Sequence, residues 1–316
     1  MYYYKLQTLL DHIEGAYAEN TIRAYRIDMR DFIAYCDRLA QCPWPAKPDT
    51  VANYLLDHVN RDLKASTIQR RFNTISAIHR LSHITDPTKH PEVRLAMRKI
   101  KRRLGVRPEQ ASPINHHLLE RMLAVCGNNQ RGLRDRALLL TAYDSMCRRS
   151  ELVAITVSDI QYDLHDNAML HIRRSKTDQL GTGQRVPLTT RTVDAIVRWL
   201  ESAEITEGYI FRGINNKGEL LDGISSGQVN QIYKRFAKRA GLGDDEVLKI
   251  RGHSMRVGAA QDLARSGSTI PQTLAKGRWS KIDTMYRYIQ HLEMKNLRLI
   301  SEFFMTAVRR MMISNH

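Results

Sequence analysis

The first hundred residues repeat apolar side chains at helical spacing, and none of them alternate apolar and polar residues as a strand does. Residues 18–39 begin with Asn20 or Thr21 as the expected cap and then place an apolar residue every three or four positions. The same period marks segments 48–59, 65–84 and 90–106. Three prolines in CPWPAKP (42–48) separate the first two segments, because proline interrupts a helix interior. The sequence therefore predicts a small helical bundle.

The fourth segment ends in a basic run that contains no acidic residue. Its members are Arg94, Arg98, Lys99, Lys101, Arg102, Arg103 and Arg107. Such a run is either a solvated helix face or a contact with a polyanion. The stretch VRPEQASPI (106–114) that follows is typical of a linker. We therefore expect one domain over residues 1–107 and a second over 108–316.

The second part of the chain combines helices with one strand pattern. Residues 167–188 alternate apolar and polar side chains on either side of Gly181 and Gly183, which predicts a β-hairpin. Helical segments precede and follow this hairpin. The expected fold class is mainly α with a small β-sheet, in which an α+β domain follows a helical one.

The charge of the chain indicates its partner. Lys and Arg number 49 against 33 Asp and Glu, a net charge of +16. A strongly basic globular protein usually binds a polyanion, most commonly the phosphate backbone of nucleic acid. No signal peptide or apolar stretch of about 18 residues is evident, so we expect a cytoplasmic protein without a membrane partner. The four cysteines lack the spacing of a zinc site and are expected to be reduced thiols.

The stretch GHSMRVGAAQDLARSG (252–267) places His253 and Arg256 three residues apart at the start of a predicted helix. Ser254 is the expected cap and Gly267 the expected end. Side chains three apart share a helical face, and a helix N-terminus favours anions. His253 and Arg256 are thus a candidate phosphate site, although this pattern alone is weak.

Two tyrosines follow on a short predicted helix, 281–290, for which Ser280 and Asp283 form an approximate capping box. The apolar stripe of this helix consists of Ile282, Met285, Tyr286 and Ile289. Tyr288 lies about 120° from that stripe, at about 100° per residue. We therefore expect Tyr286 in the core and Tyr288 exposed to the anion site, which makes Tyr288 the candidate nucleophile.

A second group of polar residues lies upstream. Arg148 and Glu151 stand in MCRRSELVAI (146–155), between two predicted helices, and Lys176 stands at the edge of the hairpin loop. Each has an ordinary interpretation by itself: a capped helix start for the first two, a solvated loop lysine for the third.

Taken together, in order and spacing, these residues resemble the active site of the tyrosine site-specific recombinases. The set is Arg148, Lys176, His253, Arg256, Trp279 and Tyr288, with Glu151 beside the first arginine. The run GHSMRVGAA is similar to the Cre-like branch of that family. Residues 20–36, 65–71 and 95–103 resemble the family's helical, SAM-like core-binding domain. The resemblance extends over nearly the whole chain.

The resemblance implies a role for each residue. Tyr288 would attack a backbone phosphate to give a 3′-phosphotyrosyl bond and a free 5′-hydroxyl. Arg148 and Arg256 would bind the nonbridging oxygens. Lys176 would protonate the leaving 5′-oxygen, and His253 would assist proton transfer at the tyrosine.

The two remaining residues of the set would support this chemistry. Trp279 would pack against the site and donate its indole N–H to the phosphate. Glu151 would brace the arginine and the histidine. No metal or nucleotide cofactor is required, because the phosphotyrosyl bond conserves the energy of the broken strand.

The resemblance also implies a two-domain, C-shaped clamp on double-stranded DNA. A dimer would bind each short inverted-repeat site, and a homotetramer would join two sites through a Holliday junction. The expected DNA-contacting residues are Arg23, Ser66, Thr67, Gln69, Arg70, Arg102 and Arg103. A C-terminal helix would dock on a neighbouring protomer through Leu297, Ile300, Phe304, Ala307 and Met311, or else pack on its own domain.

Two other functions compete with the recombinase. A type IB topoisomerase shares the chemistry, but the small helical first domain and the run GHSMRVGAA disfavour it. A DNA-binding regulator without catalysis would keep the fold, but the complete set of six residues disfavours that interpretation.

Overall fold

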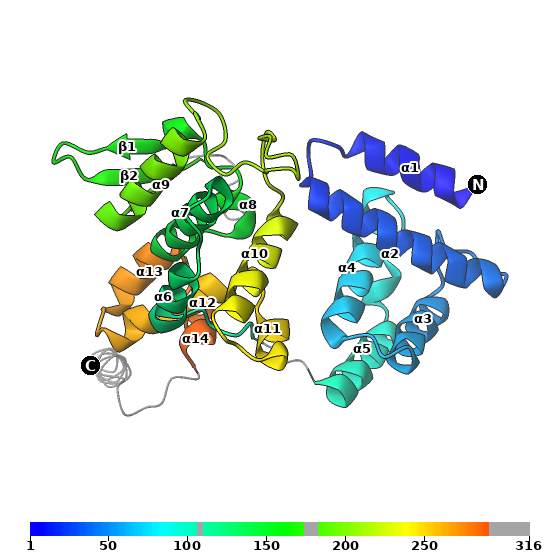
Figure 1. Ribbon diagram of the computed structural model, residues 1–316. Helices are drawn as coiled ribbons and strands as arrows, with labels where there is room; N and C mark the ends of the chain where they lie inside the picture. Colours follow the sequence, from blue (N-terminus) through cyan, green and yellow to red (C-terminus); the bar gives the residue numbers. More distant parts are fainter. Residues whose placement is uncertain (106–109, 174–182, 291–316) are drawn as a thin grey trace. The chain divides into compact units, whose positions relative to one another are not determined.

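The computed structural model describes residues 1–105, 110–173 and 183–290 (Figure 1). The chain divides into two compact units, Met1–Glu109 and Gln110–His316. Lys176, Arg107 and the predicted C-terminal docking helix lie outside the described residues. Within the described ranges, no helix is both long and apolar enough to cross a membrane.

The first unit is built from helices only. Its elements are α1 (Tyr2–His12), α2 (Glu19–Arg38), α3 (Pro48–Asn60), α4 (Ala65–Leu81), the 3₁₀ turn η1 (Pro87–Lys89) and α5 (Pro91–Leu104). The four predicted helices are confirmed, and α1 was not predicted. Fully buried Phe32, Tyr54 and Ile68 come from three different helices, so the periodic faces of these helices share one core.

The start of α2 differs from the prediction. Ala18 is the N-cap residue, and Asn20 and Thr21 already lie inside the helix. The Asn20 carboxamide oxygen accepts a hydrogen bond from Arg23 at 3.0 Å. The cap prediction was therefore wrong, because this side chain binds a neighbouring guanidinium and no backbone N–H.

The second unit combines helices with one small sheet. Its first elements are α6 (His116–Ala124), α7 (Gln130–Ser145), α8 (Arg149–Leu152), η2 (Val157–Asp159), β1 (Ile160–Tyr162), β2 (Ala168–Ile172) and β3 (Gln184–Pro187). The elements that follow are α9 (Thr190–Ser202), α10 (Ser226–Arg239), α11 (Asp244–Lys249), α12 (Ser254–Arg265), α13 (Ile270–Gly277) and α14 (Ile282–Ile289). The main core of this unit lies between the sheet and α6, α7, α9 and α10.

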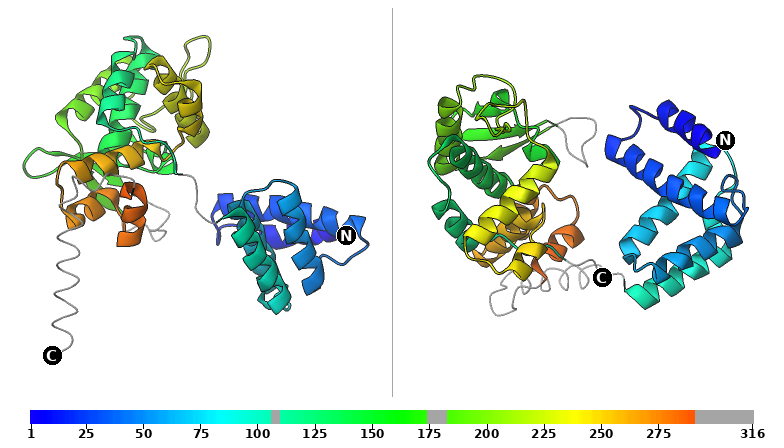
Figure 2. Two further views of the ribbon diagram at one scale, coloured as in Figure 1. Left: turned by 90° about the horizontal axis from the view of Figure 1, so that it is seen from below. Right: turned by 45° about the vertical axis from the view of Figure 1, so that its right-hand side comes forward.

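The sheet is antiparallel in the order β1-β2-β3. Leu170 in the central strand lies opposite Ile160 and Val186, and alternate residues of β2 are buried. The predicted hairpin is confirmed as β2 and β3, with β1 added at its edge. In Figure 1 and in the right-hand view of Figure 2, the sheet lies at one end of this unit and α14 at the other.

A separate apolar cluster forms where α12, α13 and α14 meet. Its buried members are Met146, Ala259, Ala260, Ala264, Trp279, Met285 and Ile289. Gly258 allows the chain that enters the unit to lie directly on α12, since a Cβ atom there would be 1.9 Å from the carbonyl oxygen of Ile114. This close packing fixes the start of α12 within the unit.

Candidate active site

The start of α12 carries His253 and Arg256. His253 is the N-cap residue and is exposed, and Ser254 is the first residue of the helix. The Ser254 hydroxyl accepts the backbone N–H of Arg251 at 2.9 Å, so the prediction of Ser254 as the cap was wrong by one position. The helix ends at Arg265, and Gly267 follows in the left-handed conformation as expected.

Arg256 is almost completely buried, with 2% of its surface exposed. Its Nη1 donates to the Met146 carbonyl oxygen at 3.0 Å and its Nη2 donates to the Gly277 carbonyl oxygen. The guanidinium carbon lies 5.0 Å from the centre of the Trp279 ring, within the range of a cation–π contact. Burial and the nearby charge of Arg148 lower the pKa of Arg256 to about 10, so it stays protonated at neutral pH.

Arg148 and Glu151 form an ion pair at the start of α8. Arg148 Nη1 donates to Glu151 Oε1 at 2.7 Å, and its backbone N–H donates to Oε2 at 2.9 Å. Burial by itself would raise the pKa of Glu151, but the charge of Arg278 and the hydrogen bonds from Arg148 outweigh burial and lower it. Glu151 is therefore ionised and holds two arginines; its predicted bracing of His253 stays a prediction.

Trp279 connects the buried arginine to Tyr288. The two aromatic rings stack with centroids 5.0 Å apart and an interplanar angle of 27°. A Cβ atom on Gly277 would lie 2.2 Å from the Trp279 ring, so glycine at 277 makes room for the indole. The carbonyl oxygen of Tyr288 accepts hydrogen bonds from Gln110 and Gln261, both at 3.2 Å, which hold the end of α14 against α12.

The helical-wheel prediction for the two tyrosines was wrong in its detail. Met285 and Ile289 form the buried face of α14, and Tyr286 and Tyr288 are both half-buried beside it. The N-cap residue is Lys281, so the predicted capping box is also absent from this helix start. Tyr288 stacks on Trp279, a contact that a helical wheel cannot predict because Trp279 lies outside the helix.

Tyr288 also lies within electrostatic reach of the buried arginine. After the larger effects of burial and of Arg148, a negative charge on Tyr288 acts to raise the pKa of Arg256. The Tyr288 phenol and the Arg256 guanidinium are therefore close enough to interact electrostatically.

Arg278 was missed by sequence reasoning. Its side chain is 4% exposed, and Nη2 donates to Glu151 Oε2 at 2.8 Å. The residue directly precedes Trp279 and has no periodic or motif signal, and the high arginine content of the chain hides it. The structure thus places a third arginine beside Arg148 and Arg256. Across the described ranges, no group of three or more His, Cys, Asp or Glu side chains is arranged to hold a metal ion.

The predicted DNA-contacting residues of the first unit lie at its surface. Arg23, Ser66, Arg70, Arg102 and Arg103 are exposed, whereas Thr67 and Gln69 are half-buried. Arg70 Nη1 donates to Asp28 at 2.7 Å, which fixes the direction in which this arginine leaves α4. These residues are accessible to a partner, and their contact with DNA stays a prediction.

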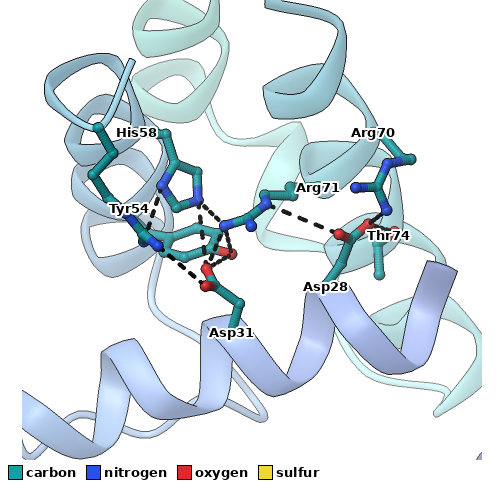
Figure 3. Close-up of polar contacts among 8 residues, drawn as sticks. Asp28, Asp31, Tyr54, His58, Arg70, Arg71 and Thr74 are labelled. Atoms are coloured by element: carbon teal, nitrogen blue, oxygen red, sulfur yellow. Dashed lines mark hydrogen bonds and ion pairs between the residues drawn. The ribbon is translucent and has the colours of Figure 1, made fainter. Parts of the chain in front are cut away.

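A buried polar network, which sequence reasoning also missed, lies beneath this surface (Figure 3). Arg71 of α4 donates to Asp31 of α2, and to Tyr54 and His58 of α3 at 3.1 and 2.6 Å. Burial, together with the charge of Arg71, lowers the pKa of His58 to about 4, so the imidazole is neutral. The network connects α4 to two other helices and so fixes the orientation of its exposed face.

Comparison with known proteins identifies the family. Residues 113–295 match the model of the Phage integrase family, and residues 7–83 match the Phage integrase N-terminal SAM-like domain. A protein described as an integrase/recombinase xerD homolog from Selenomonas ruminantium is 33% identical over 290 residues, covering 88% of this chain and 83% of that protein. This chain belongs to the phage integrase family of tyrosine recombinases.

Other relatives and solved structures agree with this family. The recombinase cre of Escherichia phage P1 is 28% identical over 88% of this chain and 86% of its own length. A structure of a lambda integrase dimer bound to a core site matches with a TM-score of 0.63, at 17% identity, over 92% of this chain and 96% of that one. A XerH recombinase in a post-cleavage complex matches with a TM-score of 0.63, at 16% identity, over 96% and 84%. These structures confirm the predicted fold class.

Family membership also decides between the competing functions. Tyrosine recombinases cleave and rejoin DNA strands, so the interpretation as a site-specific recombinase is supported over a topoisomerase or a silent regulator. The similarity to the phage P1 recombinase agrees with the predicted likeness to the Cre-like branch.

Proposed function

We propose that this protein recombines DNA at specific sites with Tyr288 as its nucleophile. The phenolic oxygen of Tyr288 attacks a backbone phosphorus, a 3′-phosphotyrosyl bond forms, and the bond to the 5′-oxygen breaks to release a 5′-hydroxyl. A 5′-hydroxyl of the partner strand then attacks the phosphotyrosyl bond and frees the tyrosine. The observation that carries this proposal is the stack of Tyr288 on Trp279, whose ring also contacts the buried Arg256.

Two arginines supply the positive charge that the transition state needs. Arg148 has 20% of its side chain exposed and is the more accessible of the two. Arg256 contributes a fixed charge, and its Nε is buried without a hydrogen-bond partner among the residues described. Donors held in place in a site of low dielectric stabilise developing negative charge without reorganisation. Arg148 and Arg256 therefore bind the nonbridging oxygens of the phosphate.

Proton transfer is assigned to two further residues. The exposed His253 stands at the start of α12, three residues before Arg256, and assists removal of the proton from Tyr288. Lys176 protonates the leaving 5′-oxygen. Trp279 holds the tyrosine ring and donates its indole N–H to the phosphate, and Glu151 orients Arg148.

Recognition and assembly follow the family pattern. Residues 1–107 bind double-stranded DNA through Arg23, Ser66, Thr67, Gln69, Arg70, Arg102 and Arg103. Residues 108–316 carry the catalytic site and a C-terminal helix that docks on a neighbouring protomer. A dimer occupies each site, a homotetramer joins two sites through a Holliday junction, and the protein acts in the cytoplasm. The surface positions of the DNA-contacting residues and the basic net charge support this proposal.

The test compares the two tyrosines of α14, which are matched because both are half-buried on one short helix. Protected sequences are first selected from random DNA and then used as nicked suicide substrates, which trap the covalent adduct. Tyr288→Phe should bind this DNA and form no adduct, whereas Tyr286→Phe should keep adduct formation. Loss of the adduct in Tyr286→Phe alone would reverse the assignment.

A further inference from the structure

Arg278 occupies a position that is unfavourable for an arginine. It is the C-cap residue that follows α13 and has a left-handed backbone, with φ 52° and ψ 51°, which side-chain-bearing residues rarely adopt. Its side chain is 4% exposed, although burial of a charge is costly without full pairing. A glycine would avoid both costs. The contacts of this side chain therefore require an explanation.

The guanidinium of Arg278 is only partly paired. Nη2 donates to Glu151 Oε2 at 2.8 Å and to the Met146 carbonyl oxygen at 3.3 Å. Nε and Nη1 are buried and have no hydrogen-bond partner within the described part of the chain. Buried donors are normally satisfied, so this arginine is not placed to complete an ordinary structural ion pair.

Charge is unbalanced at this point of the unit. The described groups whose charges act on Arg256 include Arg148, Arg278 and Glu151. Among the described residues, Glu151 is the acidic side chain of this group and pairs with Arg148 and Arg278, whereas Arg256 donates to two backbone carbonyl oxygens. Positive charge is therefore in excess among the described groups. An excess of this kind favours a doubly charged partner, such as a phosphate undergoing attack by a tyrosinate.

The two oxygens of the Glu151 carboxylate bind different donors. Oε1 accepts from the Arg148 guanidinium, whereas Oε2 accepts from the Arg148 backbone N–H and from Arg278. Within the described part of the chain, the Arg148 guanidinium binds this carboxylate through Nη1. Without Arg278, Oε2 would keep only the Arg148 backbone N–H, and the carboxylate could turn to bind the Arg148 guanidinium through both oxygens, the strongest geometry for this pair. Such a pair would withdraw the accessible arginine from the phosphate.

We propose that Arg278 is a positioning residue for DNA cleavage. It keeps Arg148 available to the phosphate by holding Oε2 of Glu151, and it adds to the positive charge of the site. This inference rests on the proposed function, because it assigns Arg278 to the same phosphate site.

The experiment measures two quantities for each variant: DNA affinity by gel shift, and the single-turnover rate of adduct formation at saturating protein. Arg278→Met keeps an unbranched, flexible side chain that replaces the aliphatic part of the arginine, and it removes the guanidinium charge. It should slow adduct formation by about 10- to 100-fold, less than the roughly 100- to 1,000-fold loss on removal of a donor that contacts the transition state directly, and leave DNA affinity unchanged. Arg278→Lys keeps the charge and should recover part of the rate.

A double variant separates the charge balance from folding. In Glu151→Gln/Arg278→Met the carboxylate is removed together with the arginine that holds its Oε2, so the Arg148 guanidinium has no carboxylate at 151 to bind through both oxygens. This variant should cleave faster than Arg278→Met. Arg265→Met is the control, since this arginine pairs with Asp262 at the surface, nine residues after Arg256 on α12; it should cleave at the wild-type rate.

Two outcomes would overturn the inference. One is a wild-type cleavage rate in Arg278→Met. The other is a double variant as slow as Arg278→Met, because a purely structural ion pair would couple the two residues in thermal stability and not in the cleavage rate. If the wild-type protein formed no adduct, or if Tyr288→Phe still formed one, the proposed function itself would fail.

Discussion

The substitution Gly277→Ala tests whether packing around Trp279 sets the position of the nucleophile Tyr288. This glycine is the last residue of α13, and its carbonyl oxygen accepts a hydrogen bond from the buried Arg256. A Cβ atom there would lie 2.2, 2.3 and 2.6 Å from three atoms of the Trp279 ring. The indole is rigid and 7% exposed, so it has to move as a whole to admit a methyl group. The same ring stacks on Tyr288.

The size of the effect follows from these distances. Carbon atoms pack at about 3.5–4.0 Å, so Gly277→Ala has to displace the indole by more than 1 Å. Overpacking of this kind costs about 1–3 kcal/mol of stability. A displacement of about 1 Å at a reacting group can cost roughly 100-fold in rate. We therefore expect modest loss of stability and a large loss of cleavage rate.

The assay is single-turnover adduct formation, together with thermal unfolding followed by circular dichroism. Gly227→Ala is the matched control, because its Cβ atom would lie 3.6 Å from the Ser225 hydroxyl oxygen, an ordinary contact in the first turn of α10. The control should keep the wild-type rate and stability or gain slightly. A Gly277→Ala protein that cleaves at the wild-type rate would refute the view that the indole positions Tyr288.

Two further predictions concern the first unit. Burial and the charge of Arg71 lower the pKa of His58 to about 4, so His58 should show no protonation above about pH 5 in an NMR titration, with its signal assigned by His58→Gln. Because an unfolded histidine has a pKa of about 6.5, the unit should lose stability as pH falls from about 6.5 towards 4. A titration midpoint near 6.5 would contradict the network in Figure 3. In binding selections, Arg70→Ala should relax sequence preference and cost about 1–3 kcal/mol of binding free energy. Arg102→Ala should weaken binding to all sequences and lower the slope of log affinity against log salt concentration by about 1. A uniform loss of affinity with Arg70→Ala would indicate that Arg70 contacts a phosphate and reads no base.

Local pattern in the sequence was sufficient for much of the architecture. Helices α2 to α5 of the first unit follow from apolar residues at helical spacing, and the hairpin follows from alternation on either side of two glycines, because both periods are properties of the backbone itself. The likeness to tyrosine recombinases also depends only on the order and spacing of residues along the chain. Family membership and fold class could therefore be predicted from the sequence, as the comparisons confirm.

The environment of each site residue was decided by the tertiary structure. A helical wheel gives the angle between Tyr286 and Tyr288, but not the neighbour on each side, and the neighbour that distinguishes Tyr288 is Trp279 from the preceding loop. Arg278 could not be recognised as a site residue for the same reason, since its partner Glu151 lies 127 residues earlier in the chain. Burial and electrostatic interaction depend on distances through space between segments remote in sequence, and only the folded chain sets those distances.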